Sequence, residues 1–367
     1  MFQFFSSKNK VKILIATGKL SAIGDSIFIA SKINLVIDYY KAKGMDVHFD
    51  ILINDSRLFA KLLYKDYIDT GKVTVYKLKY SMSRKPKNAL NRLIKISTNF
   101  LYNCFYSSIL RVKNYNYYIS LHAEMPRQFV RMFNFIFKSK PYFFKFDTFL
   151  DYLKINSYYG NLPSLNFVSS HNFDKKTIGL YVAASSFQKI WHPRYWADLI
   201  RYIKHKYKDE YTINIYGNGK IAIDIYSSIM FYLDELKLYP NIDFFNCINK
   251  NSIELDLQHC KGLELAISND SGFLWVANCF KIKNIAILGF EDGKRYSDLF
   301  KNSNFIYINS QLPCAPCNKY AKIIDIEIKC PYRVEDGKIS FYKCSTESRA
   351  PQVYQAIDDL LARPSII

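Results

Sequence analysis

The sequence places small and ionisable residues in three loops, at residues 21–25, 183–191 and 268–272. Each loop follows a β-branched apolar run and precedes a stretch of helical periodicity, which is the pattern of strand, loop and helix. Ligands of open α/β sheets bind at the carboxyl ends of the strands. These loops are therefore the candidate binding segments.

The first loop ends in Gly24 and Asp25. A carboxylate at the start of a helix, beside a glycine that lets the backbone turn, can accept a proton from a substrate hydroxyl. Aspartate is also a favoured helix N-cap residue. Both interpretations of Asp25, base and cap, stay open.

The second loop contains Ser185, Ser186 and Lys189, followed by Trp191. Two hydroxyls and one ammonium group are suitable donors to phosphate oxygens. The alternative is a lysine that is simply solvated.

The third loop contains Asp270, Ser271 and Gly272 before an apolar helix. The N–H groups and the dipole of a helix start favour a diphosphate at this place. Alternatively, Asp270 or Ser271 caps the helix and Gly272 allows close packing.

The chain of 367 residues has a net charge of +19, which favours an anionic partner. Lys and Arg are dense from Lys77 to Lys145, where Glu124 is the one acidic residue. A solvated, lysine-rich surface is the alternative interpretation of this stretch. No apolar run approaches the roughly 20 residues that span a bilayer. We expect a cytoplasmic protein.

The last four of the eight cysteines are spaced C-x2-C-x12-C-x13-C, at Cys314, Cys317, Cys330 and Cys344. Four thiolates at such spacings are compatible with a structural zinc or iron site. The alternative is a set of loosely packed thiols.

The chain contains two series of alternating strand and helix patterns, and a polar segment at residues 157–176 separates them. The chain is long enough for two domains. We predict a first lobe at residues 1–165, a second at 166–350, and a C-terminal helix and tail at 351–367. A cleft is expected between the lobes.

The three loops, in this order, resemble glycosyltransferase family 9, the bacterial heptosyltransferases of the lipopolysaccharide core. The family's S-A-x-G-D loop corresponds to Ser21–Asp25, its K-x-W to Lys189–Trp191, and its D-[TS]-G turn to Asp270–Gly272. The resemblance extends from about Lys12 to Cys317.

This resemblance implies a GT-B fold, with two Rossmann-like lobes that bind the acceptor and the nucleotide sugar respectively. Asp25 falls on the presumed general base and Lys189 on the phosphate contact of an inverting transfer. The implied nucleotide-sugar site consists of Ser185, Ser186, Lys189, Gly217, Asp270, Ser271 and Gly272. The implied acceptor site consists of Gly24 and Asp25, with Arg84, Lys85 and Arg92 from the basic stretch.

The implied donor is a nucleotide sugar, with ADP-heptose expected first, and the implied acceptor is an anionic glycan or glycolipid at the inner membrane surface. No D-x-D motif occurs, so we expect no metal in catalysis. Trp275 stands where the family often has His, and Ile221 and Ala222 stand near an expected acidic position, so the donor pocket differs.

Two alternatives remain. Autotransporter heptosyltransferases resemble the chain in their added, iron-holding cysteines. A non-catalytic protein that binds nucleic acid or an anionic membrane would also fit the charge, although we expect no nucleic-acid partner because no RNA-binding motif is present.

Overall fold

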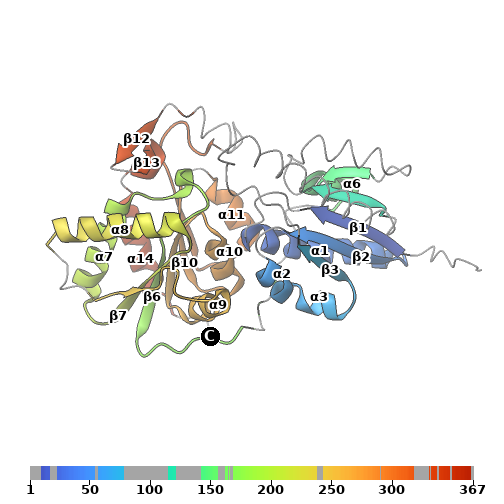
Figure 1. Cartoon of the computed structure of the whole chain (residues 1–367), viewed down its shortest axis with the longest axis horizontal. Helices are drawn as coiled ribbons and strands as arrows, with labels where there is room; N and C mark the ends of the chain where they lie inside the picture. Colours follow the sequence, from blue (N-terminus) through green and yellow to red (C-terminus); the bar gives the residue numbers. More distant parts are fainter. Residues whose placement is uncertain are drawn as a thin grey trace, which may run out of the picture. The chain divides into compact units, whose positions relative to one another are not determined.

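The structure is a computed structural model, and its two units are drawn in Figure 1. It describes residues 10–16, 23–53, 57–77, 115–120, 142–155, 162–163, 165, 168–237, 243–289, 291–317, 330, 332–336, 339–347 and 349–364. Contacts divide the chain into unit 1, Met1–Asn161, and unit 2, Leu162–Ile367. The sequence-based boundary was placed four residues later, at 165 and 166.

Unit 1 is a parallel five-stranded sheet with the order β3-β2-β1-β4-β5. The buried apolar side chains of β1, Ile13, Leu14 and Ile15, explain why this strand is central. Its elements are β1 (Lys10–Ala16), α1 (Ile23–Ala42), β2 (Asp46–Ile53), α2 (Arg57–Leu63), α3 (Lys65–Asp69), β3 (Val73–Lys77), β4 (Tyr117–Ser120), β5 (Tyr142–Lys145) and α6 (Phe146–Tyr152).

Unit 2 has a parallel six-stranded sheet with the order β11-β10-β9-β6-β7-β8. Its first elements are β6 (Lys176–Tyr181), the 3-10 turn η1 (Phe187–Lys189), α7 (Pro193–Tyr207), β7 (Tyr211–Tyr216), α8 (Lys220–Glu235), β8 (Phe245–Asn246) and α9 (Ile253–Gly262). The chain continues through β9 (Leu265–Asn269), α10 (Gly272–Cys279), β10 (Lys283–Leu288), α11 (Gly293–Phe300) and β11 (Phe305–Asn309). It ends with the antiparallel hairpin β12 (Arg333–Asp336) and β13 (Ile339–Tyr342), then α13 (Lys343–Thr346) and α14 (Ala350–Leu361).

Successive residues of the unit 2 strands point to opposite faces of the sheet, and both faces are buried. Ile285 and Ile287 of β10 belong to the core beneath α7, α8 and α14. Ala286 and Leu288 of the same strand pack with residues of α10 and α11 instead. In Figure 1, these two groups of helices lie on either side of β10. The near-continuous apolar runs of the sequence are therefore strands covered on both faces.

The C-terminal segment is attached to the sheet by a buried side chain. Arg349 is 1% exposed, and its guanidinium donates to the carbonyl oxygens of Leu288 at 2.5 Å and of Cys344 at 2.9 Å. Burial lowers the pKa of Arg349 to about 10. Because Leu288 is the last residue of β10, this contact attaches the C-terminal segment to the carboxyl end of that strand.

None of the helices in the described ranges is both long and apolar enough to cross a membrane.

Candidate functional site

The strand order of unit 2 reverses between β6 and β9, which are neighbours in the sheet although η1, α7, β7, α8, β8 and α9 lie between them in the chain. Loops that leave two such strands diverge to opposite faces, and the crevice between them is where doubly wound sheets bind ligands. The second and third predicted loops leave these two strands. The strand order therefore brings them together.

A buried ion pair joins the two loops. The Nζ atom of Lys189, in η1, lies 2.6 Å from Oδ2 of Asp270, directly after β9. Their side chains are 14% and 5% exposed. Removing two charges from water is costly and is offset only by close geometry and further hydrogen bonds. The site therefore depends on groups that hold each partner.

Asn269 holds the Lys189 loop, and the sequence did not reveal this role. Its buried side chain accepts from the backbone N–H of Trp191 at 2.9 Å and donates to the carbonyl oxygen of Val182 at 2.8 Å. One amide thus joins both ends of the segment that carries Lys189 to the end of β9. The sequence placed Asn269 in the third loop, residues 268–272, whereas it is the buried last residue of β9.

Tyr296 holds the other partner. Its hydroxyl donates to Oδ1 of Asp270 at 2.9 Å. Burial first, and the neighbouring Asp270 next, raise the pKa of Tyr296 well above its usual range, so the phenol keeps its proton. Trp275 packs edge-on against this ring at 5.7 Å between centroids.

Two serines of the predicted nucleotide-sugar site lie directly before helical segments. Ser186 precedes η1 and Ser271 precedes α10, and neither side chain caps its helix. Both hydroxyl oxygens are buried and lack a hydrogen-bond partner in the described ranges of the chain. Buried polar atoms are normally satisfied, so these two are available to a ligand. Ser185, beside them, is exposed.

Gly217 follows β7, and its missing side chain is required for packing. A Cβ atom there would lie 2.8 Å from Cβ of Ala222 and 3.0 Å from Cδ1 of Ile248. The ring of Tyr181 stacks with the rings of Tyr216 and Phe273, at 4.9 and 4.7 Å between centroids. This stack aligns the ends of β6 and β7 with α10.

Comparison with known proteins agrees with this arrangement. Residues 146–326 match the model of Glycosyltransferase family 9 (heptosyltransferase). This segment is a family 9 glycosyltransferase domain. The predicted resemblance to this family is confirmed, and the matched segment contains the second and third loops, whereas the first loop, residues 21–25, lies outside it.

A lipooligosaccharide heptosyltransferase 2 of Campylobacter jejuni is 27% identical over 187 residues, which are 51% of this chain and 52% of that protein. The match thus spans about half the length of the curated relative. The structure of E. coli ADP-heptose LPS heptosyltransferase II superposes with a TM-score of 0.54 at 13% identity, covering 96% of this chain and 98% of that one.

The iron-containing dodecameric glycosyltransferase TibC of enterotoxigenic E. coli superposes with a TM-score of 0.55 at 12% identity, covering 96% of this chain and 76% of TibC. These structures have the GT-B fold, and so does this chain. The predicted fold class is confirmed.

The acceptor-side predictions fall largely outside the described residues. Gly24 is buried in the first turn of α1, and Asp25 is the third residue of that helix, where the dipole favours an anion. The side chain of Asp25 is not among those described, and neither are Arg84, Lys85 and Arg92. α1 follows β1, beside the point where the strand order of unit 1 reverses between β1 and β4.

The four C-terminal cysteines lie around the hairpin and α13. Burial raises the pKa of the Cys344 thiol to about 11, with Cys317 contributing, and the pKa of Cys317 is raised by burial and then by Cys314 and Cys330. Within the described residues, however, no three His, Cys, Asp or Glu side chains gather closely enough to hold a metal ion. A zinc or iron held by these cysteines stays a prediction.

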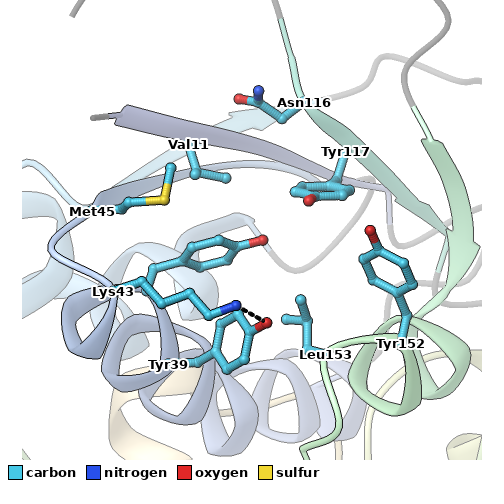
Figure 2. Close-up of a pocket in the computed structure, with 9 residues that line it drawn as sticks. Val11, Tyr39, Lys43, Met45, Asn116, Tyr117, Tyr152 and Leu153 are labelled. Atoms are coloured by element: carbon cyan, nitrogen blue, oxygen red, sulfur yellow. Dashed lines mark hydrogen bonds between the residues drawn. The ribbon is translucent and has the colours of Figure 1, made fainter. Parts of the chain in front are cut away.

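A cavity of about 420 Å³ lies in unit 1, at the amino ends of β1 and β4 (Figure 2). Its lining includes the four tyrosines Tyr39, Tyr40, Tyr117 and Tyr152, and Lys43 donates to the hydroxyl of Tyr39. None of the predicted site residues lines it. The cavity thus lies at the amino ends of these strands, whereas ligands of parallel sheets bind at the carboxyl ends.

The first prediction concerns the support of the Lys189 loop. Asn269→Ala leaves a buried N–H and a buried C=O unpaired, each costing about 1–3 kcal/mol. We expect the free energy of unfolding to fall by about 2–5 kcal/mol and the Trp191 amide to exchange faster with solvent. Denaturant unfolding and hydrogen exchange measure these effects.

Asn278→Ala is the matched control, because Asn278 is equally buried and its amide donates to Leu274 and accepts from Asn302. It should lower stability without selectively exposing the Trp191 amide. Equal protection of that amide in the two variants would show that Asn269 does not hold the loop.

Proposed function

We propose that this chain is an inverting glycosyltransferase that moves heptose from ADP-heptose onto an anionic bacterial surface glycan, with the lipopolysaccharide inner core as the first candidate. The observation that carries the proposal is the Lys189–Asp270 pair at the strand reversal of a family 9 domain. The names of its relatives support the donor, since they include an ADP-heptose LPS heptosyltransferase and TibC in complex with ADP-D-β-D-heptose.

On the donor side, the start of α10 offers backbone N–H groups and a favourable dipole to the diphosphate. Ser186 and Ser271 supply hydroxyl donors, and Lys189 supplies positive charge held in place by Asp270. As the bond between the anomeric carbon and the diphosphate breaks, negative charge grows on the leaving ADP. Donors fixed in advance stabilise that charge without reorganising.

On the acceptor side, the hydroxyl oxygen of the acceptor attacks the anomeric carbon from the face opposite the leaving diphosphate. Asp25 accepts the proton of this hydroxyl as the new bond forms. Gly24 lets the backbone approach, and Arg84, Lys85 and Arg92 attract an anionic acceptor. We propose that this transfer requires no metal, and that the enzyme works in the cytoplasm, against the inner membrane surface where a glycolipid acceptor is accessible.

An autotransporter protein heptosyltransferase is the second candidate. The observation in its favour is the four-cysteine spacing together with the structural likeness to TibC, which is described as iron-containing. Comparing a lipopolysaccharide inner-core acceptor with a protein acceptor, at equal ADP-heptose, decides between the two.

The second prediction separates the roles of Asp25 and Lys189. Asp25→Asn keeps the shape and removes the basicity, so turnover should fall by about 10² to 10⁴ while ADP affinity stays nearly normal. Lys189→Ala should weaken donor binding and turnover together, since its charge acts in the ground and transition states alike. Initial rates of ADP release and calorimetric titration with ADP measure both.

Near-normal turnover of Asp25→Asn at saturating acceptor would mean that Asp25 is only a helix-start residue and that the base lies elsewhere, with Glu124 the next candidate. Rates with UDP-sugars or GDP-sugars that exceed the rate with ADP-heptose would overturn the proposed donor.

The third prediction concerns the cysteines. If Cys314, Cys317, Cys330 and Cys344 hold a structural metal, metal binding is coupled to folding of the C-terminal segment. Elemental analysis should then give about one zinc or iron per chain, and chelation should lower the melting temperature more than it lowers activity in the cold. Well under one metal per chain in protein purified without chelators would contradict a metal site.

A further inference from the structure

Tyr296 is a buried polar residue that the proposed reaction does not use directly. It lies on α11, is 8% exposed, and donates to Oδ1 of Asp270 at 2.9 Å. The second oxygen of the same carboxylate, Oδ2, lies 2.6 Å from Nζ of Lys189. One carboxylate thus connects the phenol of α11 with the ammonium group at the donor site.

Packing fixes the direction of the Tyr296 hydroxyl. The ring is stacked on Phe300, one turn later in α11, at 5.5 Å and an interplanar angle of 2°. Trp275 of α10 packs edge-on against both rings. Two helices therefore hold the ring in one orientation, and the hydroxyl has little freedom to turn away from Asp270.

α11 is itself anchored at its start, next to β11. The backbone N–H of Gly293 donates to Oδ1 of Asn309 at 3.2 Å, and Asp292 caps the helix through the N–H of Lys294 at 3.1 Å. A Cβ atom on Gly293 would lie 2.1 Å from the ring of Tyr307, so only glycine permits this approach. The position of the Tyr296 hydroxyl is thus set by the sheet.

We propose that Tyr296 is a positioning residue, which fixes the rotamer of Asp270 so that this carboxylate holds Lys189 in place for the donor diphosphate. The terminal torsion of an aspartate is broad, and a lysine has a flexible stem with a point charge at its end. Neither the Asp270 carboxylate nor the Lys189 side chain therefore fixes the position of the ammonium group by itself. A hydrogen bond to Oδ1 leaves Oδ2 directed at the ammonium group.

The identity of the ligand in this inference rests on the proposed function, whereas the coupling of Tyr296 to Lys189 does not. A purely structural role is the alternative, because the Tyr296 ring also belongs to the core beside Leu274 and Leu288. Tyr296→Phe separates the two, since it keeps the ring and its packing and removes only the hydroxyl.

The test is a double-mutant cycle on the full chain, measured as kcat/KM for ADP-heptose. If Tyr296 acts through Lys189, Tyr296→Phe should lower kcat/KM by about tenfold in the wild-type background, as expected for a hydrogen bond to a charged group. In a Lys189→Ala background the same change should cost less than about twofold, because the group that it positions is gone. Equal factors in the two backgrounds would overturn the inference.

A second readout needs no turnover. The rate of Lys189 acetylation by limiting acetic anhydride, followed by mass spectrometry, reports how firmly Asp270 holds the amine. Tyr296→Phe should raise this rate by about fivefold. Tyr202→Phe is the matched control, because it also removes a phenol donor to a carboxylate, at 2.7 Å from Asp358, and should leave Lys189 unchanged.

The two readouts distinguish the possible failures. An unchanged acetylation rate of Lys189 in Tyr296→Phe would overturn the positioning role, whatever the activity. A raised rate in a protein that neither binds ADP nor releases it from ADP-heptose would support the positioning role and overturn the proposed function instead.

Discussion

The ion pair between Lys189 and Asp270 determines how the ends of β6 and β9 are built, because two charges that are largely removed from water must be held closely or they destabilise the fold. Each partner is accordingly supported by a different element. Asn269 joins the Lys189 loop to β9 through two hydrogen bonds, and Tyr296 fixes Asp270 from α11. The pair and its supports span β6, β9, α10 and α11.

This arrangement fits the proposed transfer from a nucleotide sugar. A preformed cation that is already desolvated and fixed loses little entropy when a diphosphate arrives, and it stabilises leaving-group charge without moving. The start of α10 and the buried hydroxyls of Ser186 and Ser271 add donors at the same place. The carboxylate of Asp270 keeps the site close to neutral before the anion binds, which limits the cost of burying Lys189.

Trp275 is a position at which the sequence differs from the pattern of the family that it resembles, and its ring supports Tyr296. The sequence marked Trp275 as a replacement for histidine, and the structure gives it a packing role against Tyr296 and Phe300. A large apolar ring here stabilises the tyrosine that contacts Asp270.

Much of this was predictable from local pattern. Strand, loop and helix were predicted around residues 183–191 and 268–272, and the structure has β6 and α7 around the first of these loops and β9 and α10 around the second. Apolar runs followed by helical periodicity are strong local signals. Lys189, Asp270 and Ser271 could be proposed because they lie in loops that follow strands. The family resemblance supplied their proposed roles.

The supports could not be predicted, because they depend on contacts between residues distant in sequence. Nothing local distinguishes Tyr296 from the other tyrosines of the chain until α11 is folded beside Asp270. Asn269 was assigned to the third loop, residues 268–272, although β9 extends to Asn269, because element boundaries are the least certain part of such predictions. The cysteine spacing indicated a metal, but spacing alone does not establish that four thiols converge.

A diphosphate site at the strand reversal of unit 2 is tested most directly by comparing the affinities of ADP and AMP by calorimetry in the wild type and in Lys189→Ala. ADP should bind the wild type at least about tenfold more tightly than AMP, because its second phosphate gains one charge-assisted contact. Lys189→Ala should largely abolish that difference while AMP affinity stays similar. Equal affinities of ADP and AMP for the wild type, or a difference that survives in Lys189→Ala, would show that Lys189 does not hold a diphosphate there.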